Sequence, residues 1–249
     1  MIPGPIDTEA IVLKTFTTGE SDQIVTLYSL AAGKVRALAK GAKRSQKRFM
    51  NCLDPLGHVV VGLAERRGGD LLRLDNCRLI HRPALTADLL RFGLGGLVLE
   101  IILQLCPEGE PEAGVFNALR RTLTALEDHP APLELALVFN FKVLFILGYG
   151  PNFETCLICR RPLERIKGAG FDLGAGGLVC SDCRPSQARL SLGAIKTIRL
   201  CQRLDAEALD RIRFPASETA DLFGQTARYL QGVAGREIKS LVFLDKVGG

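Results

Sequence analysis

The spacing of apolar residues changes once along the 249-residue chain, near residues 80–84, and this change constrains the fold most. Before it, short apolar runs alternate with turn residues, which is typical of β-strands. After it, apolar residues recur at positions i, i+4, i+7 and i+8, which is typical of amphipathic helices. The sequence therefore predicts an α+β protein of two domains, with strands in residues 1–80 and helices in residues 81–249.

Five short strands are expected in the first domain. Turn residues separate them, and Arg67-Gly68-Gly69-Asp70 reads as a hairpin turn because glycine adopts positive φ at little cost. The expected strands are residues 9–16, 23–29, 35–39, 56–64 and 71–80. Short strands with turn signals at this spacing predict a small antiparallel barrel or sandwich.

Helical patterns fill most of the second domain. Pro107 ends the first helix, and Gly148 with Gly150-Pro151 ends the third. Helical spacing of the first helix begins at Thr86, and the other expected helices are residues 111–127, 132–147, 192–203, 206–212, 217–232 and 238–244. The region between the third and fourth helices has a different composition and contains half of the cysteines.

Two Cys-x-x-Cys pairs, Cys156/Cys159 and Cys180/Cys183, stand 20 residues apart in this region. Each such turn directs two thiolates to one point, and two turns complete a tetrahedral metal site that leaves no position for water. The spacing predicts a structural Zn²⁺ within residues 152–190. Two redox pairs, disulfides or an iron–sulfur cluster are the alternatives, although no thioredoxin-like pattern surrounds the pairs. The isolated Cys52, Cys77, Cys106 and Cys201 are expected to be small buried hydrophobic residues.

Positive charge is concentrated in the first domain. Residues 1–80 contain 12 Lys and Arg against 8 Asp and Glu, whereas the remainder contains 20 against 19. One segment without any acidic residue contains seven of these cations: Lys34, Arg36, Lys40, Lys43, Arg44, Lys47 and Arg48. Cations at this density neutralise phosphates, so the segment is a candidate nucleic-acid surface, with Phe49 as a candidate stacking face. A merely solvated basic face is the alternative.

Motifs that would indicate an enzyme are missing from the sequence. It contains no Walker-type phosphate loop, no GxSxG motif and no convincing pair of carboxylates, and His58, His81 and His129 are scattered. The N-terminus has no signal-peptide pattern, and the longest apolar stretch, residues 93–106, is too short to span a bilayer. The sequence predicts a cytoplasmic protein that is neither an enzyme nor bound to a membrane.

Four segments of the first domain resemble the N-terminal signature of the bacterial recombination mediator RecO family. They are Ala10-Ile11-Val12-Leu13, Gly19-Glu20-x-Asp22, Ala39-Lys40-Gly41-Ala42-Lys43-Arg44-Ser45 and Leu53-x-Pro55, and Gly33 also fits. The helical remainder with its four-cysteine insertion resembles the zinc-bearing members of that family. The motifs that carry this resemblance are confined to residues 10–55 and 156–183.

The resemblance implies an N-terminal OB-fold barrel over residues 1–80 and an α-helical domain over residues 81–249. It further implies binding to single- and double-stranded DNA, annealing of complementary strands and, with RecR, loading of RecA on DNA coated by single-stranded DNA-binding protein, without nucleotide hydrolysis. The seven basic residues become the DNA surface, and the four paired cysteines become the zinc ligands. We expect a monomer when the chain is alone.

Three other functions compete with this interpretation. A zinc-stabilised adaptor that binds only proteins would account for the metal and the helices, but it would leave the basic segment unexplained. A nuclease or ligase-like enzyme would need clustered carboxylates. The third is a barrel that binds RNA, because the sequence alone distinguishes poorly between RNA-binding and DNA-binding barrels.

Overall fold

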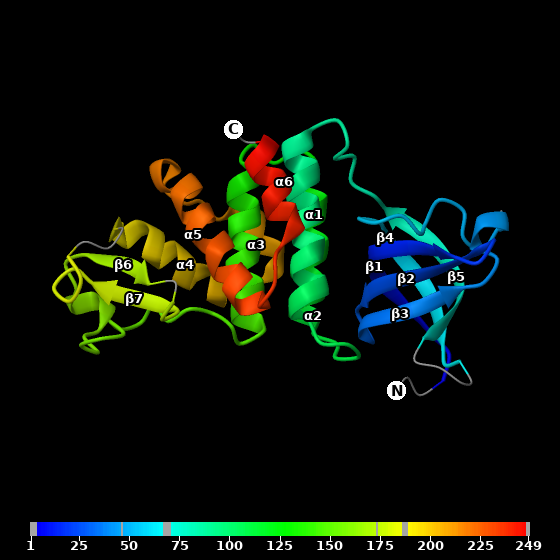
Figure 1. Cartoon of the computed structure of the whole chain (residues 1–249), viewed down its shortest axis with the longest axis horizontal. Coiled ribbons are helices and arrows are strands. Elements are labelled where there is room, and N and C mark those ends of the chain that lie inside the picture. Colours follow the sequence, from blue (N-terminus) through cyan, green and yellow to red (C-terminus); the bar gives the residue numbers. More distant parts are fainter. Residues whose placement is uncertain (1–3, 46, 67–70, 173, 186–188, 248–249) are drawn as a thin grey trace.

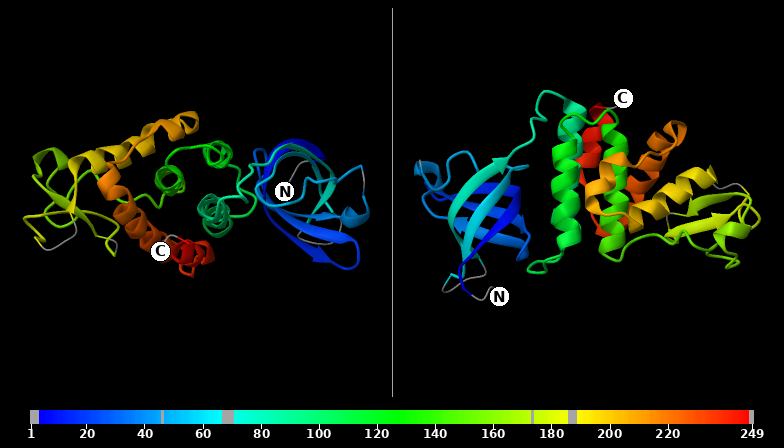
Figure 2. Two further views of the ribbon diagram at one scale, coloured as in Figure 1. Left: turned by 90° about the horizontal axis from the view of Figure 1, so that it is seen from above. Right: turned by 180° about the vertical axis from the view of Figure 1, so that it is seen from behind.

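The chain is elongated, with a barrel at one end, helices in the middle and a small sheet at the other end (Figure 1). The computed structural model describes residues 4–45, 47–66, 71–172, 174–185 and 189–247. Views from above and from behind show the same order of parts (Figure 2). The hairpin turn expected at residues 67–70 lies outside the described residues.

Five strands form the closed barrel, in the order β1-β2-β3-β5-β4. Neighbouring strands are antiparallel except β3 and β5, which pair in parallel at Ala37–Leu72 and Leu38–Arg73. The strands are β1 (Ile6–Thr18), β2 (Asp22–Ser29), β3 (Gly33–Ala39), β4 (His58–Ala64) and β5 (Leu72–His81). The structure confirms the five-stranded barrel, which is consistent with an OB-fold. The fourth strand begins two residues later than expected, because Leu56 has a φ of 71°, outside the extended region.

The barrel interior is filled by small and aliphatic side chains from alternate strand positions. Val25, Leu27, Ala37, Val59 and Val61 are fully buried in it. Cys52 and Cys77 are also buried there, each with its Sγ near the other's carbonyl oxygen, at 3.3 and 3.5 Å. Burial of these two thiols matches the expectation for isolated cysteines, as does burial of Cys106 and Cys201.

Six helices and a 3₁₀ segment form the second part of the described chain, and α3 lies at its centre. Every residue from Glu134 to Leu144 of α3 is buried, because α1, α2, α4 and α5 all pack against it. The helices are α1 (Leu89–Leu105), α2 (Ala113–Ala125), α3 (Pro132–Ile146), α4 (Leu192–Arg203), α5 (Ala216–Ala234) and α6 (Lys239–Val247). The expected helix at residues 206–212 is the 3₁₀ helix η3 (Ala206–Arg211). The 3₁₀ helix η2 (Leu163–Arg165) and the strands β6 (Ala169–Asp172), β7 (Gly177–Cys180) and β8 (Arg189–Leu190) lie between α3 and α4.

The barrel and the helices share one hydrophobic core. Ile11, Leu13, Tyr28 and Leu56 from the barrel belong to the same buried cluster as the helices. The Tyr28 hydroxyl donates to the Glu112 carbonyl oxygen at 3.4 Å, and burial raises the pKa of Tyr28 well above its ordinary value. These contacts fix the barrel against α1 and α2.

Gly33 lies where β3 approaches the loop after α1. Its φ is +65°, and an added Cβ would collide with the Glu110 backbone. We expect Gly33→Ala to destabilise the fold by more than about 2 kcal/mol, because the clash adds to the cost of positive φ. Thermal denaturation measures this loss. Gly19→Ala is the matched control, since Gly19 has a φ of +58° with open space around it. Equal losses in both variants would contradict the clash.

Candidate nucleic-acid interface and metal centre

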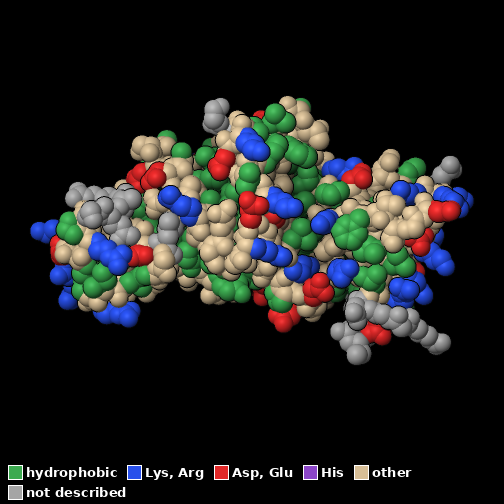
Figure 3. All heavy atoms as spheres, viewed as in Figure 1, with side chains coloured by type: hydrophobic (Ala, Val, Ile, Leu, Met, Phe, Trp, Pro, Cys, Tyr) green, Lys and Arg blue, Asp and Glu red, His purple; other side chains and the backbone are tan. Residues whose placement is uncertain are grey.

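Six exposed cations form a surface at the barrel end of the molecule, which we call the basic surface. Lys and Arg side chains are prominent around this end in the space-filling view (Figure 3). The basic surface consists of Arg36 on β3 and Lys40, Lys43, Arg44, Lys47 and Arg48 after it. Arg44 pairs with Glu20 at 3.1 Å, but both side chains are largely exposed, so this pair is weak. The cations therefore remain available to a polyanion.

Backbone hydrogen bonds hold the segment after β3 against the barrel. The Gly41 N–H donates to Asp22 Oδ1 at 2.7 Å, and the Lys43 N–H donates to the Ser21 carbonyl oxygen at 3.0 Å. The Cys77 N–H of β5 donates to the Arg48 carbonyl oxygen at 2.8 Å. Gly41 has a φ of 68°, which allows the turn into the 3₁₀ helix η1 (Ala42–Arg44). The backbone is thus positioned while the cationic side chains stay exposed.

Lys34, the first residue of the expected DNA surface, lies apart from the other six. It is 9% exposed, and its Nζ donates to the Leu103 carbonyl oxygen of α1 at 2.8 Å. Burial lowers the pKa of this ammonium. Its position on β3 turns it toward the helices, so it joins the barrel to α1 and is not part of the basic surface.

Phe49 was expected to offer a stacking face, and the structure shows that this expectation is wrong. The side chain is 4% exposed and packs in the barrel interior. The Arg48 guanidinium lies over its ring, 5.0 Å from the centroid. Burial of a large aromatic side chain is favourable, and the loop has no alternating pattern from which its orientation could have been read.

The four paired cysteines lie together at the opposite end of the molecule. All four Sγ atoms are within 4.8 Å of one another, and the cysteines are free thiols. The Cys156–Cys183 and Cys159–Cys180 sulfur separations are 3.9 and 3.8 Å. A tetrahedron with metal–sulfur bonds of about 2.3 Å has edges of about 3.8 Å. The cluster therefore fits one metal ion bound by four thiolates.

Two similar turns bring these cysteines together. The Arg160 N–H donates to the Cys156 carbonyl oxygen at 2.9 Å, and the Arg184 N–H donates to that of Cys180 at 3.1 Å. The Cys180 N–H also points to Cys156 Sγ at 3.4 Å. Burial opposes ionisation of Cys156, but the backbone N–H groups outweigh it and lower the pKa of this thiol to about 6. The lowered pKa favours the thiolate form that binds metals.

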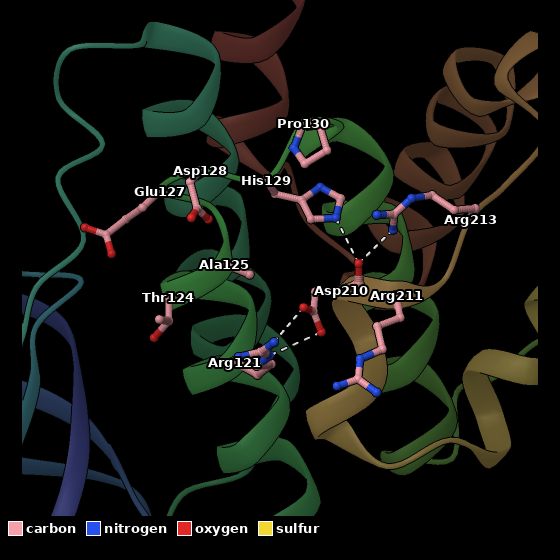
Figure 4. A pocket seen from close by; sticks show the side chains of 10 residues that line it. All are labelled: Arg121, Thr124, Ala125, Glu127, Asp128, His129, Pro130, Asp210, Arg211 and Arg213. Atoms are coloured by element: carbon pink, nitrogen blue, oxygen red, sulfur yellow. Dashed lines mark hydrogen bonds and ion pairs between the residues drawn. The ribbon is translucent and has the colours of Figure 1, made fainter.

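A pocket of about 710 Å³ lies between the α2–α3 turn and η3 (Figure 4). Arg121 bonds both carboxylate oxygens of Asp210, at 3.2 and 2.5 Å, while His129 and Arg213 bond the Asp210 carbonyl oxygen. Partial burial opposes ionisation of Asp210, but the Arg121 guanidinium holds the pKa of this carboxyl below its ordinary value. Because these lining groups are hydrogen-bonded to one another, we interpret the pocket as a polar contact that holds the helices together.

The other histidines also have structural partners. His58 lies 2.9 Å from Glu9, and its burial lowers its pKa against the opposing effect of that carboxylate. His81 lies 2.8 Å from Glu127 of the α2–α3 turn. Among the described residues, the four cysteines are the group arranged to hold a metal ion. No helix in the described ranges is both long and apolar enough for a membrane crossing.

Comparison with known proteins gives matches along almost the whole chain. Residues 1–83 match the family model "Recombination protein O N terminal", and residues 86–241 match "Recombination protein O C terminal". Three similar curated proteins are each named "DNA repair protein RecO". The protein of Syntrophobacter fumaroxidans is 36% identical over 243 residues, covering 96% of both chains. The protein of Geobacter sulfurreducens is 33% identical, and the match covers 98% of both chains. The protein of Syntrophus aciditrophicus is 30% identical, and the match covers 96% of this chain and 95% of the relative. The barrel, the helical part and these matches together establish that the chain belongs to the RecO family.

Proposed function

We propose that this protein is a DNA repair and recombination mediator that binds single- and double-stranded DNA and anneals complementary strands. The observation that carries the proposal is the basic surface, whose six cations are all exposed, on a segment free of acidic residues from 34 to 48. The names of the relatives support the role in DNA repair. Residues 1–80 serve as the DNA-binding domain and residues 81–249 as the helical domain.

Annealing by this surface needs no active-site chemistry. Phosphates of two strands repel each other, and cations that contact both strands lower this repulsion so that pairing can nucleate. Phosphate contacts carry no base information, so binding is independent of sequence. The protein therefore acts without nucleotide hydrolysis and is not an enzyme.

The remaining parts of the proposal follow from the family. With RecR, the protein assists loading of RecA on DNA that is coated by single-stranded DNA-binding protein, in the cytoplasm. One structural Zn²⁺ is held by Cys156, Cys159, Cys180 and Cys183, within residues 152–190. Four thiolates occupy every position of a tetrahedral ion, so the metal would stabilise this region without binding a substrate.

Strand annealing tests the proposal most directly. Two complementary labelled oligonucleotides are mixed with the whole protein, without nucleotide, across a series of salt concentrations. Faster annealing at low salt, together with a shift in DNA mobility, is the expected result. A folded, zinc-loaded protein that neither binds nor anneals DNA would contradict the proposal and favour the adaptor that binds only proteins.

A further inference from the structure

The outer face of the barrel carries a row of apolar side chains across three strands. Phe16 of β1 lies opposite Ile24 of β2, which lies opposite Leu38 of β3. The Phe16 side chain is 39% exposed, although phenylalanine is usually buried. None of the three residues belongs to either hydrophobic core of the described chain. This row needs an explanation other than packing of the fold.

Strand alternation places the row on the side away from the interior. Val25 and Ala37, the next residues along β2 and β3, are fully buried in the barrel. Successive side chains of a strand point to opposite faces, so Ile24 and Leu38 point outward. The register between β1 and β2 extends this outward row to Phe16.

Cations lie along one side of the row and at one end of it. Lys14, Thr26 and Arg36 form the adjacent row on this face, and Lys14 Nζ lies over one face of the Phe16 ring, 5.3 Å from its centroid. Leu38 pairs on its other side with Arg73 of β5, which is itself bonded to Asp75. Hydrophobic side chains with Lys and Arg side chains around them are visible on the barrel face turned to the viewer (Figure 3). Because Arg36 belongs to the basic surface, the row is adjacent to it.

We propose that Phe16 is a stacking platform for an unpaired base of single-stranded DNA. An exposed aromatic ring beside a cation matches a base that is attached to a charged backbone, and every base offers a π-face for stacking. The phosphates of the same strand lie along Lys14, Arg36 and the basic surface. Bases inside a duplex are already stacked, so this contact distinguishes single strands from double strands. This inference rests on the proposed function and adds to it a contact between the protein and a base.

Binding to a thymidine oligonucleotide and to an abasic oligonucleotide of equal length tests this contact. Both carry the same phosphates, and only the first carries bases. The wild-type protein is expected to bind the thymidine strand about 10-fold more tightly. Phe16→Ala is expected to remove this difference and to leave the affinity for the abasic strand unchanged. Leu30→Ala is the matched control, because Leu30 is also 39% exposed but lies in the turn directly after β2.

The absence of tryptophan from the chain allows a second measurement. Phe16→Trp introduces a single indole whose fluorescence is expected to be quenched by the thymidine strand but not by the abasic strand or by a duplex. This variant retains an aromatic ring and should keep the wild-type preference for bases.

The outcomes separate this inference from the proposed function. A wild-type protein that binds neither oligonucleotide nor duplex contradicts the proposed function itself. Binding of both oligonucleotides with equal affinity, or a base preference that survives Phe16→Ala, would overturn the stacking contact alone. In that case, a protein partner that binds the wild-type protein but not the Phe16→Ala variant would assign the apolar row to protein binding.

Discussion

Replacing Lys40, Lys43 and Arg44 together by alanine is expected to reduce the dependence of DNA affinity on salt. Each phosphate contact contributes about 0.7 to the slope of log K against log salt for single strands and about 0.9 for duplexes. Loss of three contacts should lower the slope by about 2 for single strands and by nearly 3 for duplexes, and it should weaken binding at low salt by roughly 100-fold or more. Titrations at several salt concentrations measure both quantities. Annealing should be slowed in parallel.

The control removes three cations from elsewhere on the molecule. Arg228 on α5 and both Lys239 and Lys246 on α6 are exposed, and their replacement by alanine changes the net charge by the same amount. This variant is expected to keep the wild-type slope. An unchanged slope in the Lys40/Lys43/Arg44 variant would show that the basic surface is not part of the DNA interface. Equal reductions of the slope in this variant and in the control would indicate an effect of net charge.

Removal of the metal is expected to unfold the cysteine end of the molecule and to spare the barrel. Apparent binding energies of structural zinc sites are on the order of 10 kcal/mol, and Cys180→Ala removes one of the four thiolates. Metal content should fall from one ion per chain to nearly none, and the amides of β6 and β7 should lose protection from hydrogen exchange. The barrel amides should keep theirs, because the barrel interior is a separate hydrophobic cluster.

Cys201→Ala is the matched control for this experiment. Cys201 lies on α4, is fully buried and is not part of the cluster of four sulfur atoms. The variant loses one buried thiol but should retain the metal and the protection of β6 and β7. Retention of a full complement of metal by Cys180→Ala would contradict the assignment of the four cysteines as ligands.

Much of the fold could be predicted because its signals are local. Periodicity placed α4 at its observed residues and located α1 between Thr86 and Pro107, since helix spacing and the residues at each end are read from adjacent positions. The four cysteines came together as expected, because each pair forms its own turn. Closure of the barrel by β3 and β5 depends on parallel pairing between distant segments, and the strand pattern alone predicted only an antiparallel barrel or sandwich.

The residues of the candidate interface were harder to predict, because charge and aromatic character do not show which way a side chain faces. Lys34 lies in the same basic segment as Lys40, but its place on β3 directs it to α1. Phe49 follows the cations directly and is nevertheless buried. Phe16 carries no signal in the sequence, because its significance depends on the register that places Ile24 and Leu38 beside it.

The shared core between the barrel and the helices has a consequence for directionality. A DNA strand has two different ends, whereas a layer of phosphates looks almost the same in both directions. A base held in one orientation on a barrel that cannot rotate against α1 and α2 would define the strand's 5′ and 3′ sides relative to the helical end. The helical end would then always lie on the same side of the bound strand, a polarity that a flexible linker between the two parts would erase.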